Sequence, residues 1–144
     1  MKPFIIALMM LLAPGVFAQD EQGGQFKDLG PWEVHYIAFP STFVQPTIAK
    51  AYGLIRSGNK AIVNISVLAD KPGKPAVKAR VAGSAKNLLG KTIQLEFKEV
   101  VEGEAIYYLA QLDYDDEDIF RFDIEISEGK QSRKLTFSQK FYVE

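Results

Sequence analysis

From residue 61 onward, hydrophobic and polar residues alternate with a period of two over most of the chain. The clearest runs are Ala61–Ala69 and Phe120–Ile126, and in the second Phe and Ile alternate with charged residues. Turn signals separate the runs, among them Asp70–Pro75, Glu102–Glu104 and Glu128–Lys130. Such alternation indicates strands with one dry and one wet face, which are typical of antiparallel sheets. Helical runs do not alternate with the strands, so a parallel sheet is not expected.

About seven to eight such strands, joined by short turns, predict an all-β fold. We expect a single-domain antiparallel β-sandwich, immunoglobulin-like in its two packed sheets, with one short helical segment. The alternative is a small β-barrel, in which one sheet closes on itself. The residues expected to dominate the core are Phe97, Tyr108, Phe122, Ile124 and Phe137.

The stretch Trp32–Ala69 departs from this simple alternation. Its first run, Trp32–Phe39, is partly apolar on both faces, which predicts a strand that is covered on both sides. Pro46 fits the first turn of a helix, and Gly53 can supply the left-handed residue that ends one. We therefore predict a short helical segment over Gln45–Tyr52, between two strands.

The chain begins with the pattern of a secretory signal peptide. Lys2 supplies a positive start, Phe4–Ala13 is an unbroken apolar run, and Val16–Ala18 offers small or apolar residues to a signal peptidase. The apolar run is too short for a membrane span, which needs about 20 residues. We therefore expect cleavage after Ala18, no membrane span in the mature form, and export to the periplasm.

The expected domain organisation follows from this signal. Residues 1–18 form the signal peptide, and the polar, glycine-rich residues that follow make 19–30 a flexible mature N-terminus. Residues 31–144 form a single β-sandwich domain, whose size suits one hydrophobic core without covalent staples.

Composition and charge exclude several classes of protein. The chain has no cysteine, which rules out disulfides and a lipid-anchoring cysteine. Without Lys2, the mature chain has 16 basic and 18 acidic residues and a formal charge of −2. This balance shows no basic bias towards nucleic acid or an anionic membrane surface, so no nucleic-acid partner is predicted.

Residues for metal or catalytic chemistry are sparse. His35 is the only histidine, and a zinc site needs three or four nitrogen or sulfur ligands, so neither a metal site nor a cofactor is predicted. The acidic run Asp113–Asp118 lacks the spacing of an EF-hand and is expected to be a solvated turn, with a calcium site as the alternative. A hydrolase would have to combine Ser41 or Ser57 with His35, without a G-x-S-x-G motif, and no catalytic residue is predicted.

Polar side chains that could recognise a ligand concentrate in the stretch Trp32–Ala69. This candidate site for a ligand or partner consists of His35, Ser41, Thr42, Tyr52, Arg56, Ser57 and Asn64. The guanidinium of Arg56 could tie down carbonyls left open at the helix end, or present its donors to a ligand carboxylate or phosphate. The tie is the favoured interpretation of Arg56.

The same stretch carries a family resemblance. The run from Val34 to Phe43, the pattern P-x-x-A-x-x-Y-G-x-x-R-S from Pro46 to Ser57, and Asn64–Leu68 resemble small exported gammaproteobacterial proteins grouped as domain of unknown function 4426. Further matches are Asn87-Leu88, Glu102–Tyr108, and the closing Phe137-x-Gln139-x-Phe141-Tyr142. The resemblance covers nearly the whole mature chain. It implies export and a single-domain β fold, and it supplies no catalytic residue.

These observations predict an uncharacterised periplasmic β-sandwich that serves as a non-enzymatic binding or accessory module of the cell envelope. The expected partner is an unknown envelope protein or a small ligand. One alternative is an envelope hydrolase or other enzyme. Another is a purely structural accessory domain, in which the polar set only fixes the connection between the helix and the next strand.

Overall fold

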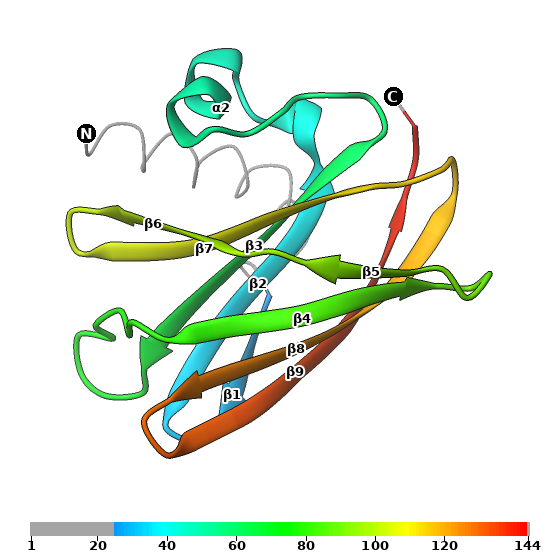
Figure 1. Ribbon diagram of the computed structural model, residues 1–144. Coiled ribbons are helices and arrows are strands. Elements are labelled where there is room, and N and C mark those ends of the chain that lie inside the picture. The colour runs from blue at the N-terminus through cyan, green and yellow to red at the C-terminus, as the bar shows by residue number, and fades with distance from the viewer. Residues whose placement is uncertain (1–24, 144) are drawn as a thin grey trace.

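The computed structural model describes residues 25–143, so the predicted signal peptide and its cleavage site lie outside the described residues. Two antiparallel sheets pack face to face (Figure 1). One sheet has five strands in the order β1-β2-β3-β7-β6, and the other has four in the order β5-β4-β8-β9. The predicted β-sandwich is therefore confirmed, because the sheets remain separate and do not close into the alternative barrel. The strands are β1 (Phe26–Leu29), β2 (Trp32–Pro40), β3 (Lys60–Ala69), β4 (Arg80–Asn87), β5 (Thr92–Leu95), β6 (Lys98–Glu102), β7 (Ala105–Asp113), β8 (Asp118–Glu128) and β9 (Gln131–Phe141).

The first strand lies inside the segment 19–30, for which the sequence predicts a flexible N-terminus. β1 pairs antiparallel with β2, and Gly30 takes a left-handed conformation (φ 68°) in the turn between them. The alternation pattern missed this strand because Phe26, Lys27 and Asp28 are all exposed. An edge strand with no buried residue leaves no periodic signal in the sequence.

The chain passes from the four-stranded to the five-stranded sheet between β5 and β6, although the alternation of hydrophobic and polar residues continues there. Ile93, Leu95 and Phe97 alternate with polar residues, yet β5 belongs to the four-stranded sheet and β6 to the five-stranded one. Leu95 is buried and Phe97 packs against the same core from the corner between the strands. Because the corner keeps both side chains on the core side, periodicity alone does not reveal it.

The main core lies between the two sheets and is rich in aromatic side chains. The ring of Phe122 stacks on that of Phe137 with 4.7 Å between centroids, and Tyr114 stacks on Phe141 at 4.9 Å. Of the predicted core residues, Tyr108, Phe122 and Ile124 are buried, and Phe97 and Phe137 are partly buried against them.

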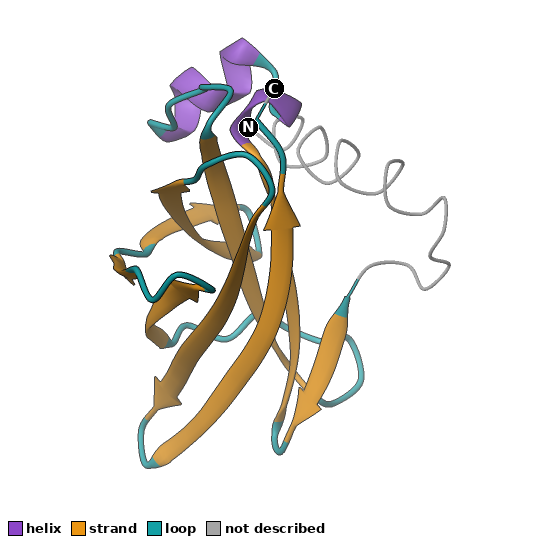
Figure 2. Ribbon diagram, turned by 90° about the vertical axis from the view of Figure 1, so that its right-hand side faces the viewer, coloured by secondary structure: helices purple, strands orange, loops and turns teal. Residues whose placement is uncertain are grey.

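A second apolar cluster lies on the outer face of the five-stranded sheet. The 3-10 helix η1 (Ser41–Phe43) and helix α2 (Pro46–Tyr52) follow β2 and gather at one end of the strands (Figure 2). Gly53 ends α2 in the left-handed conformation (φ 71°), as the sequence predicts. The members of this cluster are Phe39, Val44, Ile48, Ala49, Tyr52, Ile62, Tyr107 and Leu109. Neither helix of residues 25–143 has the length and apolarity needed to cross a membrane.

Candidate functional site

Part of the predicted polar set ties η1 to the loop that precedes β3. Arg56 donates from Nε to the carbonyl of Val44 (2.7 Å) and from Nη2 to that of Thr42 (3.2 Å). Ser41 is fully buried, and its hydroxyl donates to the carbonyl of Ser57 (3.1 Å) and accepts from the Ser57 N–H (2.9 Å). The geometry therefore matches the backbone tie for Arg56 and its neighbours. These contacts fix the path of the chain out of β2 and back into β3.

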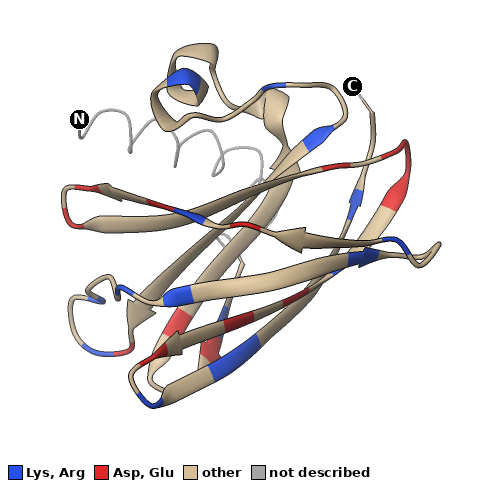
Figure 3. Cartoon of the chain, viewed as in Figure 1, with Lys and Arg blue, Asp and Glu red and all other residues tan. Residues whose placement is uncertain are grey.

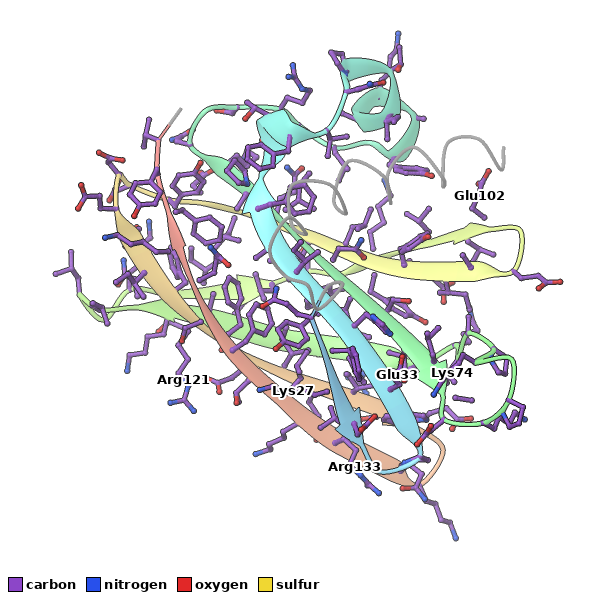
Figure 4. All side chains as sticks on the ribbon, turned by 180° about the vertical axis from the view of Figure 1, so that it is seen from behind. Lys27, Glu33, Lys74, Glu102, Arg121 and Arg133 are labelled. Carbon is purple, nitrogen blue, oxygen red and sulfur yellow. The ribbon has the colours of Figure 1, made fainter. Side chains whose placement is uncertain are left out.

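His35 lies elsewhere, on the outer face of β2. Its Nε2 is 2.6 Å from Oε2 of Glu33, and Glu33 Oε1 is 3.0 Å from Nζ of Lys74 (Figure 4). The hydrogen bond from Lys74, followed by that from His35, holds the pKa of Glu33 below its ordinary value. Sequence reasoning missed this partner, although Glu33 and His35 are two residues apart and therefore share a face.

The surroundings of His35 form only part of a hydrolase arrangement. Ser66 is paired directly with His35 across β2 and β3, but no hydrogen bond joins the two side chains within residues 25–143. Lys74 also binds Asp70, so the network anchors the loop after β3 to β2. The ring of Phe26 packs beside the imidazole at 5.2 Å. A base–carboxylate pair is present, whereas a nucleophile bonded to the base is not.

Tyr52 is the last residue of α2 and belongs to the second apolar cluster. The residue is 7% exposed, and the Nζ of Lys98 donates to its carbonyl (2.8 Å). Burial, with a further contribution from the charge of Glu102, raises the pKa of Tyr52. Burial also raises the pKa of the neighbouring Tyr107 to about 12, with a smaller contribution from Tyr52. Both phenols are therefore neutral at physiological pH.

Three buried side-chain oxygens on this side of the sheet have no hydrogen-bond partner within the described part of the chain. They are Oη of Tyr52, Oδ1 of Asn64 and Oε2 of Glu102, and we call them the orphan oxygens. They come from α2, β3 and β6, and the strand register places Asn64 and Glu102 on the outer face of the five-stranded sheet. Leaving such a group buried and unpaired costs about 1–3 kcal/mol. Such a group calls for an explanation, for example a functional role or an ordered water or ion.

The sequence identified only some of these residues. Tyr52 and Asn64 belong to the predicted site, whereas the sequence places Glu102 in a turn signal and gives no role to Tyr107. The hairpin register supplies the missing signal: Val100 pairs with Tyr107 and Glu102 with Ala105, so Glu102 and Tyr107 point to the same face. That register requires the turn type, which periodicity alone does not give.

The described residues contain no group of three or more His, Cys, Asp or Glu side chains placed to hold a metal ion. In the β7–β8 turn, Asp118 accepts from the N–H of Asp115 (3.0 Å), and Asp116 accepts from the N–H of Val143 (2.9 Å). These carboxylates satisfy the backbone around them, as side chains at turns commonly do. Asp115, Asp116 and Glu117 are exposed and Asp118 is half-buried, which fits the predicted solvated turn.

Comparison with known proteins identifies a family. The family model described as a domain of unknown function, DUF4426, matches residues 26–144. A DUF4426 family protein from Pseudomonas aeruginosa PAO1 has a crystal structure with a TM-score of 0.75 and 38% identity, covering 86% of this chain and 98% of that one. No curated protein matches the sequence.

More distant structures share the fold alone. A copper-bound variant of FetP from uropathogenic Escherichia coli strain F11 has a TM-score of 0.54 and 11% identity, covering 83% of this chain and 94% of that one. FetP from the same strain, expressed in the periplasm of E. coli, has a TM-score of 0.53 and 12% identity, covering 83% and 92%. At this identity the likeness concerns the sandwich and not its chemistry.

Proposed function

The chain belongs to the DUF4426 family, and on that premise we propose that it is a non-enzymatic binding or accessory module of the cell envelope, working in the periplasm. The proposed binding surface is the outer face of the five-stranded sheet beside α2. The observation that carries this proposal is the set of orphan oxygens at Tyr52, Asn64 and Glu102.

The orphan oxygens indicate the chemistry of the ligand. Asn64 Oδ1 and Glu102 Oε2 can only accept hydrogen bonds, whereas the phenol of Tyr52 can accept or donate. A matching ligand donates hydrogen bonds, as an ammonium group or a series of peptide N–H groups does. The side chains beside them are apolar, among them the buried Leu109 and the partly buried Val100. Apolar surroundings with a few directed polar groups are typical of binding sites.

The alternative of an enzyme has one observation in its favour, the hydrogen-bonded pair of His35 and Glu33. A general base needs a proton donor within reach, and Ser66 is the nearest candidate by strand register. His35→Ala separates the two functions. Under our proposal it leaves partner binding unchanged, whereas an enzyme would lose its activity.

Copper binding, which is stated for the FetP variant, is not part of this proposal. Copper sites are built from imidazole, thiolate and thioether ligands. This chain has one histidine and no cysteine, and its methionines are Met1, Met9 and Met10, within the predicted signal peptide. We therefore expect the mature protein to bind Cu(II) no more tightly than its His35→Ala variant does, in a calorimetric titration.

Periplasmic location has its own test. The protein purified from a periplasmic fraction is expected to begin at Gln19, because the apolar run Phe4–Ala13 precedes a peptidase-compatible Val16–Ala18. Intact mass spectrometry measures this directly. A mass that still includes residues 1–18 would contradict the cleavage, and absence of the protein from the periplasmic fraction would contradict the export.

The binding proposal is tested with the tagged mature protein, captured against a periplasmic extract and quantified by mass spectrometry. Tyr52→Phe and Asn64→Leu each remove one of the three orphan oxygens with little change of shape. Each is expected to reduce specific capture at least ten-fold while leaving the melting temperature equal or higher, because an unpaired buried oxygen is removed. Tyr142→Phe, which removes an exposed hydroxyl, is the matched control and should capture normally.

The outcomes separate the remaining interpretations. If Tyr52→Phe and Asn64→Leu retain capture, the binding surface lies elsewhere. If they lose both capture and stability, the orphan oxygens belong to a structural element, as the accessory-domain alternative requires.

A further inference from the structure

Two adjacent leucines at the tip of the β4–β5 hairpin are exposed to solvent. Leu88 is 79% exposed and Leu89 is 90% exposed, the highest values among the exposed large hydrophobic residues of the described chain. The hairpin projects sideways beyond its neighbours in the views of Figures 1 and 4. Single exposed hydrophobic residues are ordinary, but two adjacent ones at a projecting tip call for a partner.

The tip is held in this conformation by the side chain of Asn87, which is itself buried. Its Oδ1 accepts from the N–H groups of Leu89 (3.1 Å) and Lys91 (2.8 Å). Its Nδ2 donates to Oδ1 of Asp118 (3.1 Å), which joins the tip to the start of β8. The leucines therefore cannot fold back onto the sheet without breaking this arrangement. Such preorganisation lowers the cost of binding.

Basic residues surround the leucines. Lys86 and Lys91 flank the tip in sequence, and Figure 3 shows basic residues on both arms of the hairpin. Lys86 lies directly opposite Arg121, whose exposed side chain points away from the sheet in Figure 4 and whose Nε also lies 3.4 Å from Oδ1 of Asp123. Like charges directly opposite one another destabilise a sheet. The placement of Lys86 opposite Arg121, beside an apolar tip, is explained if an anionic surface binds here.

We propose that the Leu88–Leu89 tip inserts into a phospholipid surface that contains anionic headgroups, with Lys86, Lys91 and Arg121 contacting the phosphates. Two leucyl side chains carry fewer carbons than a myristoyl chain, which alone gives only marginal membrane binding. A second, electrostatic contribution is therefore required. Each basic residue near an anionic leaflet strengthens binding roughly five-fold. A protein pocket for two leucines would not require this positive charge around them.

The β7–β8 turn sets the orientation. Its exposed carboxylates, Asp115–Glu117, lie near the tip and are repelled by anionic headgroups. Docking therefore tilts the leucine tip, with Lys86 and Arg121 beside it, towards the lipid and the acidic turn away from it. This surface differs from the orphan oxygens, so the inference does not depend on the proposed function.

The test is co-flotation of the mature protein with vesicles of phosphatidylethanolamine and phosphatidylglycerol (7:3), and with phosphatidylcholine vesicles for comparison. We expect binding to the anionic vesicles at low salt that falls at least ten-fold in 0.5 M salt, because screening removes the electrostatic contribution. The double variant Leu88→Ser/Leu89→Ser is expected to lose binding at least ten-fold. Val101→Ser, a change of an exposed apolar residue on another hairpin, is the matched control and should bind normally.

Two further variants test insertion and charge separately. Lys86→Glu/Arg121→Glu removes the attraction to anionic headgroups. Because it also breaks the ion pair of Arg121 with Asp123, its melting temperature is measured beside its binding. In Leu89→Trp, the new indole emission should shift to shorter wavelength on anionic vesicles, against a constant signal from the buried Trp32.

Wild-type protein that does not float with anionic vesicles at low salt overturns the proposal. Equal binding by the wild type and the double serine variant also overturns it, because the tip would then not insert. If a photo-crosslinker at position 89 reacts with a protein and not with lipid, the partner of the tip is a protein pocket and not a bilayer.

Discussion

The outer faces of the two sheets differ, although both sheets close the same core. On β8 of the four-stranded sheet, burial alternates strictly, and Arg121, Asp123 and Glu125 face solvent. On β3 of the five-stranded sheet, Ile62 and Asn64 on the outer face are as buried as their inward neighbours. The difference arises because η1 and α2 cover only the five-stranded sheet. A strand that is apolar on both faces therefore indicates that a segment close to it in sequence packs on its outer face.

This contrast also separates two kinds of stability. The side chains between the sheets are held on all sides by long strands, whereas the cover over the outer face is a helix of fewer than three turns, Pro46–Tyr52. A helix this short is not stable alone and depends on packing and on the hydrogen bonds around it. We therefore expect damage to the main core to cost more than damage to the cover.

The largest expected effect is in the main core. Phe122 is fully buried and stacks on Phe137, so Phe122→Ala should lower the free energy of unfolding by about 3–5 kcal/mol. Urea denaturation monitored by circular dichroism measures it. Glu125→Ala, on the outer face of the same strand, is the control and should change stability by less than about 0.5 kcal/mol. A loss below about 1 kcal/mol for Phe122→Ala would mean that the assignment of faces is wrong.

Much of this fold follows from the sequence because hydrophobic alternation reports burial directly. The strands with one wet face, such as β8, were predicted from their pattern, and the helix from Pro46 and Gly53. The edge strand β1 and the change of sheet at Leu95–Lys98 were not, because each depends on pairing between distant segments. Sheet order likewise depends on pairing that the sequence pattern does not encode.

The next effect concerns the cover. Arg56 donates to the carbonyls of Thr42, inside η1, and Val44, directly after it, so Arg56→Ala should lower stability by about 1–3 kcal/mol. Arg56→Lys keeps the charge but loses the forked donor geometry, and it should recover only part of the loss. Lys50→Ala, in the exposed side of α2, is the control.

Arg56→Ala also tests whether Arg56 ties the backbone or contacts a ligand. An Arg56→Ala protein that melts like the wild type but fails to capture its partner would show that the guanidinium serves a ligand. Thermal melts and the capture assay on one preparation give both results.

The candidate site was predictable only in part, for a related reason. The sequence placed His35, Ser41 and Arg56 in one set because they are close along the chain, and the structure separates His35 from the other two. Glu102 joins Tyr52 only through the β6–β7 hairpin, about 50 residues later in the chain. Residue type and proximity in sequence identified candidates, but their grouping required the fold.

A smaller effect, visible through pH, concerns the polar edge of the five-stranded sheet. Lys74 and then His35 lower the pKa of Glu33, so the unfolded chain binds this proton more readily than the folded one. The stabilisation is therefore present above the ordinary glutamate pKa near 4.5 and is lost as the pH falls below it. The contribution is small, because Lys74 is exposed and solvent screens its ion pairs.

The measurement is the melting temperature from pH 7 to pH 3. Glu33→Gln should lie below the wild type at neutral pH, and the two curves should converge as the solution becomes acidic. Lys74→Ala should reproduce most of this behaviour, whereas Lys71→Ala, in the same loop, should not. Curves that stay parallel throughout would show that Glu33 does not contribute through its charge.

The smallest expected effect is at the turn that joins the two sheets, between β7 and β8. Asp116 and Asp118 already accept hydrogen bonds from backbone N–H groups, and the exposed carboxylates are surrounded by water. A ligand that binds only the folded state must raise the melting temperature. Millimolar calcium is therefore expected to leave the melting temperature unchanged within about 1 °C, after correction for the effect of equal ionic strength with sodium chloride.

Asp115→Asn/Glu117→Gln, which removes the exposed charges of the turn, should show the same response to calcium as the wild type. A calcium-specific rise of several degrees that this variant loses would contradict the solvated turn and identify a cation site where one sheet passes into the other.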